Sequence, residues 1–203
     1  MKQLIVILIF LIGIPSAKAQ DSVFIAKPRI YGQLGVIFPL PYKVVPAVNV
    51  AVVLETKENL AFGLRYYGYS YNHDVPASDN VSEKYIPEHV YEEANVSIGK
   101  VLPLQKNAFL TLSAGPSFVY YKMPYNVKKV PSPSNSWGGF FNYSIYEYEV
   151  IRHNMIGGSL RGDLALYPGK KVGLNFGGFF SFNQQMTLGG VDISLVIGKS
   201  LRE

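Results

Sequence analysis

The chain has 203 residues, a formal net charge of +5, no cysteine and a hydrophobic fraction of 48%. The absence of cysteine excludes disulfides, thiolate metal sites and cysteine nucleophiles. The mild, scattered positive charge also excludes the concentrated basic surface typical of nucleic-acid binding. After Ala19, no stretch approaches the ~18 consecutive apolar residues of a membrane-spanning helix, so a membrane role would require strands.

The first residues, Met1–Ala19, have the three parts of a secretory signal peptide. Lys2 supplies the positive start, Leu4–Ile14 the apolar stretch, and Ala17-Lys18-Ala19 the small-x-small cleavage site. We therefore expect export, with cleavage after Ala19 and one mature domain over residues 20–203. Because the signal carries two lysines, the formal charge of the mature chain falls from +5 to +3.

The mature chain contains eight segments in which apolar and polar residues alternate. A period of two predicts β-strands rather than helices, and most segments reach the ~9–11 residues that a tilted membrane strand needs. The alternation is clearest in the last segment, where apolar residues alternate with Asp192 and Ser194. The sixth segment is long, with a break expected near His153. In chain order the predicted strands are 29–38, 44–55, 59–71, 90–102, 108–122, 143–167, 171–182 and 188–201.

The lengths of the connections between predicted strands follow a partial pattern, since the odd-numbered connections 39–43 and 183–187 are also short. The even-numbered connections, at 56–58, 104–106 and 168–170, are tight and polar. The two long connections, 72–89 and 123–142, are both odd-numbered. Short periplasmic turns and longer outer loops are usual in outer-membrane barrels. We therefore expect the two long loops to face the outside of the cell.

Tyrosines gather at the strand ends next to the long connections. Aromatic girdles flank the apolar band of membrane barrels, and a general preference of tyrosine for strands would not confine the clusters to one end. We therefore expect an aromatic girdle at this height. Its predicted members are Tyr66, Tyr67, Tyr69, Tyr71, Tyr120, Tyr121, Tyr143, Tyr146 and Tyr148.

The two faces of the strands differ in the size of their side chains as well as in polarity. One face carries polar and small residues, whereas the other carries large, branched apolar residues. An eight-stranded barrel has a narrow lumen that side chains must fill, so the polar face fits inside and the apolar face fits against lipid. The sequence therefore predicts an all-β, eight-stranded antiparallel up-and-down transmembrane β-barrel. A soluble periplasmic ligand-binding barrel, with the faces reversed, is the alternative.

The chain resembles the small eight-stranded outer-membrane barrels of Gram-negative bacteria, of the outer-membrane protein X and outer-membrane protein A membrane-domain type. The similarity rests on strand and hairpin patterns at Leu60–Tyr66, Ile98–Phe109 and Ser113–Ser117. It implies an outer-membrane location and contact with outer-membrane lipids, lipopolysaccharide and the barrel-insertion machinery. Such barrels usually end on an aromatic residue, whereas this chain ends Leu201-Arg202-Glu203.

Five charged residues fall on the inward parity of their strands. Arg161 and Asp163 are two positions apart, which makes them neighbours on one face, about 6–7 Å apart. Because a buried charge without a partner is very costly, we expect an ion-pair network that plugs the barrel, in preference to a proton or ion path. The five residues are Arg65, Glu93, Arg161, Asp163 and Asp192.

The three histidines, His73, His89 and His153, offer little support for chemistry. Lipid-modifying acyl hydrolases among outer-membrane barrels carry a His and a Ser at a fixed short spacing, and no His here has a Ser two residues later. Ser159 shares the parity of His153 but lies about 20 Å along the strand, beyond hydrogen-bond reach. The three histidines also lack metal-ligand spacing. The sequence therefore predicts no catalytic, cofactor or metal site.

These features favour a structural or loop-presenting role without a general pore. Adhesion or surface binding through loops 72–89 and 123–142 is one alternative, and a lipid-modifying acyl hydrolase is another. The second loop carries Lys128-Lys129, Trp137 and Phe140-Phe141. Exposed basic and aromatic residues of this kind contact extracellular partners or lipopolysaccharide phosphates.

Overall fold

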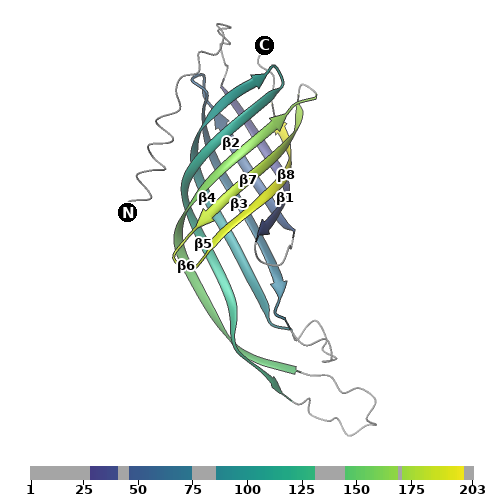
Figure 1. Ribbon diagram of the computed structural model, residues 1–203, viewed down its shortest axis with the longest axis vertical. Coiled ribbons are helices and arrows are strands. Elements are labelled where there is room, and N and C mark those ends of the chain that lie inside the picture. The colour runs from purple at the N-terminus through teal and green to yellow at the C-terminus, as the bar shows by residue number, and fades with distance from the viewer. Residues whose placement is uncertain (1–27, 41–45, 75–85, 131–144, 169–170, 199–203) are drawn as a thin grey trace.

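A computed structural model describes residues 28–40, 46–74, 86–130, 145–168 and 171–198; the predicted signal peptide and the last five residues lie outside them. Eight antiparallel strands form a closed barrel in chain order, and β1 closes the ring against β8 (Figure 1). Closure leaves the barrel without a sheet edge, so its backbone hydrogen bonds are satisfied internally. The strands are β1 Arg29–Leu40, β2 Ala47–Glu55, β3 Leu60–Asn72, β4 Glu88–Gln105, β5 Ala108–Val130, β6 Ile145–Leu166, β7 Val172–Phe182 and β8 Thr187–Gly198. Within the described residues, no helix is long and apolar enough to cross a membrane.

The strand bounds confirm the prediction except at the end of β5, and the break expected within β6 is absent. β5 does not end near Lys122 but continues to Val130, paired with the start of β6 from Met123↔Ile151 to Val130↔Ile145. β6 is also unbroken at His153, which pairs with Tyr121. The prediction of a loop over 123–142 is therefore wrong for residues 123–130, and residues 131–142 lie outside the described part.

The pairs beyond Lys122 form a two-stranded projection, called here the ribbon, made of Met123–Val130 and Ile145–Ile151. It extends from the barrel at the lower end of Figure 1. Pro124 lies within the ribbon although proline cannot donate a backbone hydrogen bond. It is tolerated because the recorded pairing with β4 has already ended at Val90↔Lys122, and prolines are accepted on sheet edges. A register irregularity between Tyr125 and Lys128 bends the pairing.

The opposite end of the barrel, called here the turn end, holds the tight connections. In the β2–β3 turn, Thr56 N donates to Leu60 O at 2.8 Å, and Asn59 takes a positive φ of 62°, which asparagine tolerates. The Thr56 side chain, by hydrogen bonding, lowers the pKa of the exposed Glu58 carboxyl. The hydrogen bond between Thr56 and Glu58 therefore stabilises the turn when Glu58 is ionised. This stabilisation is lost only as the pH falls into the acid range and the carboxylate is protonated. The predicted short turns at 56–58 and near 104–106 are confirmed, the latter beginning after Gln105.

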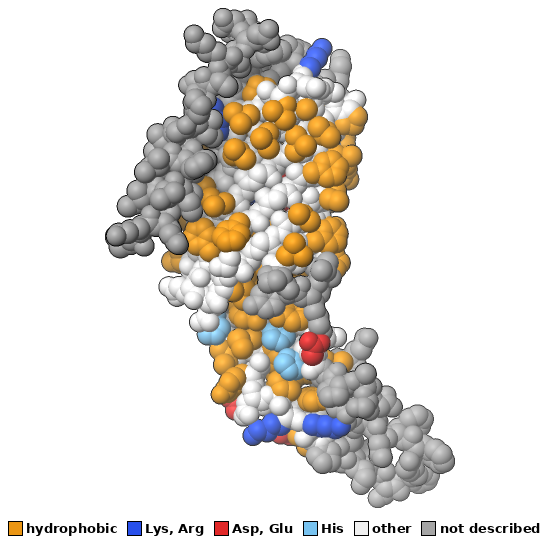
Figure 2. Space-filling view, viewed as in Figure 1, with side chains coloured by type: hydrophobic (Ala, Val, Ile, Leu, Met, Phe, Trp, Pro, Cys, Tyr) orange, Lys and Arg blue, Asp and Glu red, His pale blue; other side chains and the backbone are white. Residues whose placement is uncertain are grey.

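The barrel exposes its apolar face and buries its polar face. Ile156 is 74% exposed, whereas Asn49 on the inner face is 0% exposed. Figure 2 shows hydrophobic side chains spread over the outside of the barrel, with charged side chains near its ends and on the ribbon. This confirms the transmembrane arrangement of the faces and rules out a barrel with its apolar face inward. The outward apolar residues include Leu34, Val50, Val52, Leu64, Val96, Ile98, Phe118, Phe176, Phe180, Ile193, Leu195 and Ile197.

The predicted aromatic girdle is wrong for Tyr67, Tyr69 and Tyr71, which point into the barrel, whereas Tyr66 and Tyr148 are exposed on the outside. Tyr66 faces outward, but Tyr67 and Tyr69 are buried inside the barrel with Tyr91. The cause is strand parity, since successive residues of a strand point to opposite faces. Tyr66 and Tyr67 therefore cannot both face the membrane. The inner tyrosines form an apolar layer that fills the lumen at the ribbon end, and Tyr143 lies outside the described residues. The layer comprises Ile37, Ala47, Tyr67, Tyr69, Tyr91, Val119, Met155, Phe179 and Leu188.

Candidate functional site

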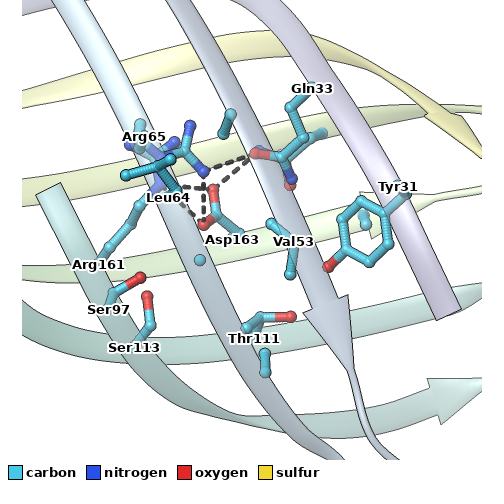
Figure 3. Close-up of a pocket in the computed structure, with 15 residues that line it drawn as sticks. Tyr31, Gln33, Val53, Leu64, Arg65, Ser97, Thr111, Ser113, Arg161 and Asp163 are labelled. Carbon is cyan, nitrogen blue, oxygen red and sulfur yellow. Dashed lines mark hydrogen bonds and ion pairs between the residues drawn. The ribbon is translucent and has the colours of Figure 1, made fainter. Parts of the chain in front are cut away.

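The middle of the lumen contains a network of two arginines and two aspartates. Arg161 Nε donates to Asp163 Oδ2 at 2.7 Å, and the Arg161 guanidinium also contacts Asp192. Arg65, across the lumen on β3, lies 3.5 Å from Asp192 Oδ2 and 3.7 Å from Asp163 Oδ2. Figure 3 shows Arg65, Arg161 and Asp163 converging inside the barrel. The predicted ion-pair plug is therefore confirmed for these four residues.

Side-chain amides complete the network. Arg65 donates to Gln33 Oε1 at 2.5 Å and to Asn49 Oδ1 at 3.0 Å. Asn49 Nδ2 donates to Asp192 Oδ2 at 2.9 Å, and Asn175 Nδ2 donates to Asp163 Oδ1 at 2.8 Å. These contacts tie β1, β2, β3, β6, β7 and β8 together through the lumen. The two guanidinium charges match the two carboxylates, so the buried group is electrically balanced.

A second ion pair lies at the turn end. Arg29 on β1 contacts Glu55 on β2, and both side chains are buried. The Arg29 guanidinium also sits 4.9 Å from the centre of the Phe109 ring, within cation–π range. The Arg29 and Glu55 side chains both point into the barrel, and nothing in the sequence identified Arg29 as the partner of Glu55. The pair is adjacent because β1 and β2 align Arg29 directly opposite Glu55.

Glu93 is buried as predicted but does not belong to the arginine network. Its Oε2 accepts hydrogen bonds from Tyr67 at 2.6 Å, Tyr91 at 2.7 Å and Ser181 at 2.7 Å. The prediction that it joins the ion pairs is therefore wrong. Strand register explains the difference. Glu93 lies opposite Tyr67 in the apolar layer, whereas the residue opposite Arg65 is Asn95.

The free space inside the barrel is small. A cavity of about 30 Å³ lies beside the arginine network and is lined by Tyr31, Gln33, Arg65, Ser97, Thr111 and Ser113, among others (Figure 3). That volume accommodates a water molecule or two. The charged residues are saturated by one another, so the arrangement is suited to fixing the strands rather than to binding or turning over a substrate.

The histidines gather at the ribbon end. His73 Nδ1 lies 3.2 Å from His89 Nε2, and His89 Nδ1 lies 3.3 Å from the Tyr121 hydroxyl. His153 on β6 is the register partner of Tyr121. Figure 2 shows the histidine side chains close to one height, where the barrel gives way to the ribbon. The histidines looked separated in sequence, and the register of β3, β4, β5 and β6 brings them to one rim.

The partners that a hydrolytic His–Ser pair would use are engaged elsewhere. Ser159 Oγ accepts a hydrogen bond from Asn95 Nδ2 at 2.7 Å, and Asp163 is bound to Arg161. His153 lies beside Tyr121 instead. Of the predicted loop-contact residues, Lys128 pairs in register with Glu147 on the ribbon, while Trp137, Phe140 and Phe141 lie outside the described residues.

Comparison with known proteins supports the fold. No family model matches the chain, and no curated protein sequence matches it. Among solved structures, Neisserial surface protein A aligns with a TM-score of 0.53 and 9% identity, covering 84% of this chain and 96% of that one. The N-terminal barrel domain of OprF from Pseudomonas aeruginosa aligns with a TM-score of 0.50 and 10% identity, covering 84% and 96%.

The attachment invasion locus protein Ail of Yersinia pestis aligns with a TM-score of 0.50 and 8% identity, covering 84% of this chain and 95% of that one. The chain has the fold of the small eight-stranded outer-membrane β-barrels. At such identities the likeness concerns the fold, and it confirms the architecture predicted from strand patterning. The function must be argued from this chain's own surface and lumen.

Proposed function

We propose that this protein is an integral outer-membrane barrel that serves as a membrane anchor and presents the ribbon at the cell surface. It is exported by the signal peptide Met1–Ala19 and acts without catalysing a reaction or forming a general pore. The observation that carries the proposal is the combination of an apolar exterior with a lumen filled by paired charges. The filled lumen leaves little space for a solute to bind or pass. The projecting ribbon is therefore the most distinctive surface of the protein.

The orientation follows from the two ends. The turn end has tight connections and the first and last described residues, Pro28 and Gly198, as expected for the periplasmic side. The ribbon end has the longer connections and would face the medium. In this orientation the ribbon stands beyond the outer leaflet, within reach of extracellular partners.

The ribbon suggests how a partner would bind. β6 pairs with β7 only from Gly158 onward, so no described strand pairs with the ribbon residues Glu147–Ile151 on that side. Among the described residues, no strand pairs with the β4 side of Met123–Lys128 either. Unpaired strand edges accept an extended peptide by β-strand addition. We therefore favour an extended protein segment as the extracellular partner.

Lipopolysaccharide is the second proposed partner. Lys122 and Arg152 lie directly opposite each other on the outward face, just beyond the apolar band. Like charges in such cross-strand pairs are destabilising, and an anionic group between them would remove the repulsion. The phosphates of the outer leaflet are anions at the appropriate height, which supports a lipid contact here rather than at Lys128-Lys129 alone.

The absence of cysteine permits a direct test of orientation. Lys128→Cys on the ribbon and Glu58→Cys at the turn end each introduce one thiol at an exposed position. We expect a membrane-impermeant maleimide to label the first variant on intact cells and the second only after the outer membrane is opened. Labelling of Glu58→Cys alone on intact cells would reverse the orientation, and labelling of neither would contradict surface presentation.

The membrane location is tested in the same cells. An outer-membrane fraction should contain a protein that migrates faster on gels unboiled than boiled, because a closed barrel resists detergent. A soluble protein with no mobility shift would overturn the proposed location independently of the labelling result.

A further inference from the structure

We propose that His73 and His89 form a binding site for a divalent first-row transition metal ion, with Zn²⁺ as the type ion, at the ribbon-end rim of the barrel. The site goes beyond the proposed anchoring role and does not depend on it, because it can be assayed on purified protein. It rests on the position of two imidazole nitrogens and on the way the surrounding strands hold the rings.

The nitrogen separation matches that of two ligands on one metal ion. His73 Nδ1 and His89 Nε2 are 3.2 Å apart. Two nitrogen ligands about 2.0–2.1 Å from a tetrahedral zinc ion are about 3.3 Å from each other. An ion placed to one side of the line between the two nitrogens would replace the hydrogen bond between the rings, and it would need the rings to turn but not the nitrogens to separate.

The backbone at both histidines is fixed by strand pairing. His73 N donates to Pro87 O at 2.7 Å, which continues the β3–β4 ladder past Asn72. His89 pairs in register with Tyr71, and their rings stack with centroids 4.6 Å apart and an interplanar angle of 2°. The two imidazoles are thus presented from adjacent strands in a defined diagonal relation, without the entropy loss of ordering a loop.

His89 also has the outer partner typical of a metal ligand. Its Nδ1 lies 3.3 Å from the Tyr121 hydroxyl on β5. Metal-binding histidines usually engage their second ring nitrogen in such a hydrogen bond, which fixes the tautomer and the ring orientation. With Nδ1–H donating to Tyr121, the lone pair of His89 is on Nε2, which in the structure faces His73 Nδ1; a bound ion would take the place of that contact.

The donor set selects the class of metal. Two imidazoles suit Zn²⁺, Ni²⁺ or Cu²⁺ and do not suit Ca²⁺ or Mg²⁺, which prefer oxygen ligands. Asp74 and Glu88 flank the two histidines in the chain and are exposed, so they add negative charge near the rim. No third His, Cys, Asp or Glu joins the pair among the described residues. The remaining coordination positions would be filled by water or by a ligand from outside.

The test is calorimetric titration of the purified, untagged protein in detergent micelles with Zn²⁺, and with Mg²⁺ for comparison. We expect one Zn²⁺ per chain with micromolar affinity and no heat of binding from Mg²⁺. His73→Asn and His89→Asn should each weaken Zn²⁺ binding by more than about tenfold, because even an outer-shell partner of a metal ligand is worth that much. Tyr121→Phe removes the outer-shell hydrogen bond to His89, and it should weaken Zn²⁺ binding less than the loss of either histidine does.

His153→Asn is the matched control, since His153 lies at the same rim next to Tyr121 but outside the pair. It should bind Zn²⁺ as the unmodified protein does. Each variant is first shown to keep the unboiled gel mobility of a closed barrel, which separates loss of the site from loss of the fold. No Zn²⁺ binding by the unmodified protein, or an equal loss in His153→Asn, would overturn the proposal.

Discussion

At the scale of the residue, Arg161 makes the shortest ion pairs of the lumen network. Replacing it by alanine leaves Asp163 and Asp192 with only the longer ion pairs to Arg65, at 3.7 and 3.5 Å, beside their hydrogen bonds from Asn175 and Asn49. Because breaking a buried ion pair strands an uncompensated charge, we expect Arg161→Ala to lower the free energy of unfolding by about 3–5 kcal/mol. Urea unfolding in micelles, followed by gel mobility or circular dichroism, measures the change.

Arg152→Ala provides the control for that loss. Arg152 lies on the same strand as Arg161, but it is exposed on the outward face beside Lys122. Its removal should change stability by less than about 0.5 kcal/mol, as usual for a surface substitution. Equal effects of the two substitutions would mean that the buried network contributes no more than an ordinary surface arginine.

At the scale of the element, two glycines show how closely neighbouring strands approach. A Cβ on Gly115 of β5 would fall against the carbonyl oxygen of Val96 and 2.7 Å from the Ser97 Cα on β4. These are backbone atoms and cannot rotate away. We therefore expect Gly115→Ala to force β4 and β5 apart and to reduce the yield of heat-modifiable barrel severalfold during refolding into micelles.

Gly178 on β7 gives the matched comparison for that substitution. A Cβ on Gly178 meets nothing within 4 Å, and the residue faces outward. Gly178→Ala should refold as well as the unmodified chain. If both alanine variants refold normally, the contact between β4 and β5 is looser than the strand geometry indicates.

The strands show which properties can be read from sequence. Period-two alternation is a local property, so it predicted the eight strands and the inward position of Arg65, Asp163 and Asp192. The same parity would have placed Tyr67 and Tyr69 inside the barrel, but the tyrosines were grouped by height alone. Contacts across strands were not predictable, because they depend on register. The pairing of Arg29 with Glu55 and the meeting of His73 with His89 both arise in this way.

The ribbon was missed for a related reason. Pro124 and the adjacent lysines Lys128-Lys129 are typical of loops, and local composition does not reveal that Met123–Val130 has a complementary strand at Ile145–Ile151. Two strands that satisfy each other's hydrogen bonds can continue past the barrel without strong strand propensity. Pattern analysis therefore identified the end of the barrel that carries the long connections but not the element that projects from it.

At the scale of the whole molecule, the lumen is closed at three successive levels. The apolar layer around Tyr91 and Phe179 fills the ribbon end, the arginine network fills the middle, and a second apolar cluster with Phe109 and Tyr167 lies at the turn end. The cavity beside the network is only about 30 Å³, and apolar side chains fill the lumen on both sides of it. We therefore expect no steady conductance in a planar lipid bilayer.

The same layering predicts that loss of stability and gain of conductance are separate. Arg161→Ala disrupts the middle level but leaves Tyr91 and Phe179 in place on its ribbon side and Phe109 on its turn side. This variant should unfold at a lower urea concentration and still show no steady current across the bilayer. Stepwise currents from the unmodified protein would contradict a plugged barrel. Currents that emerge only in Arg161→Ala would show instead that the charge network is the sole barrier and that the two apolar layers pack too loosely to exclude ions.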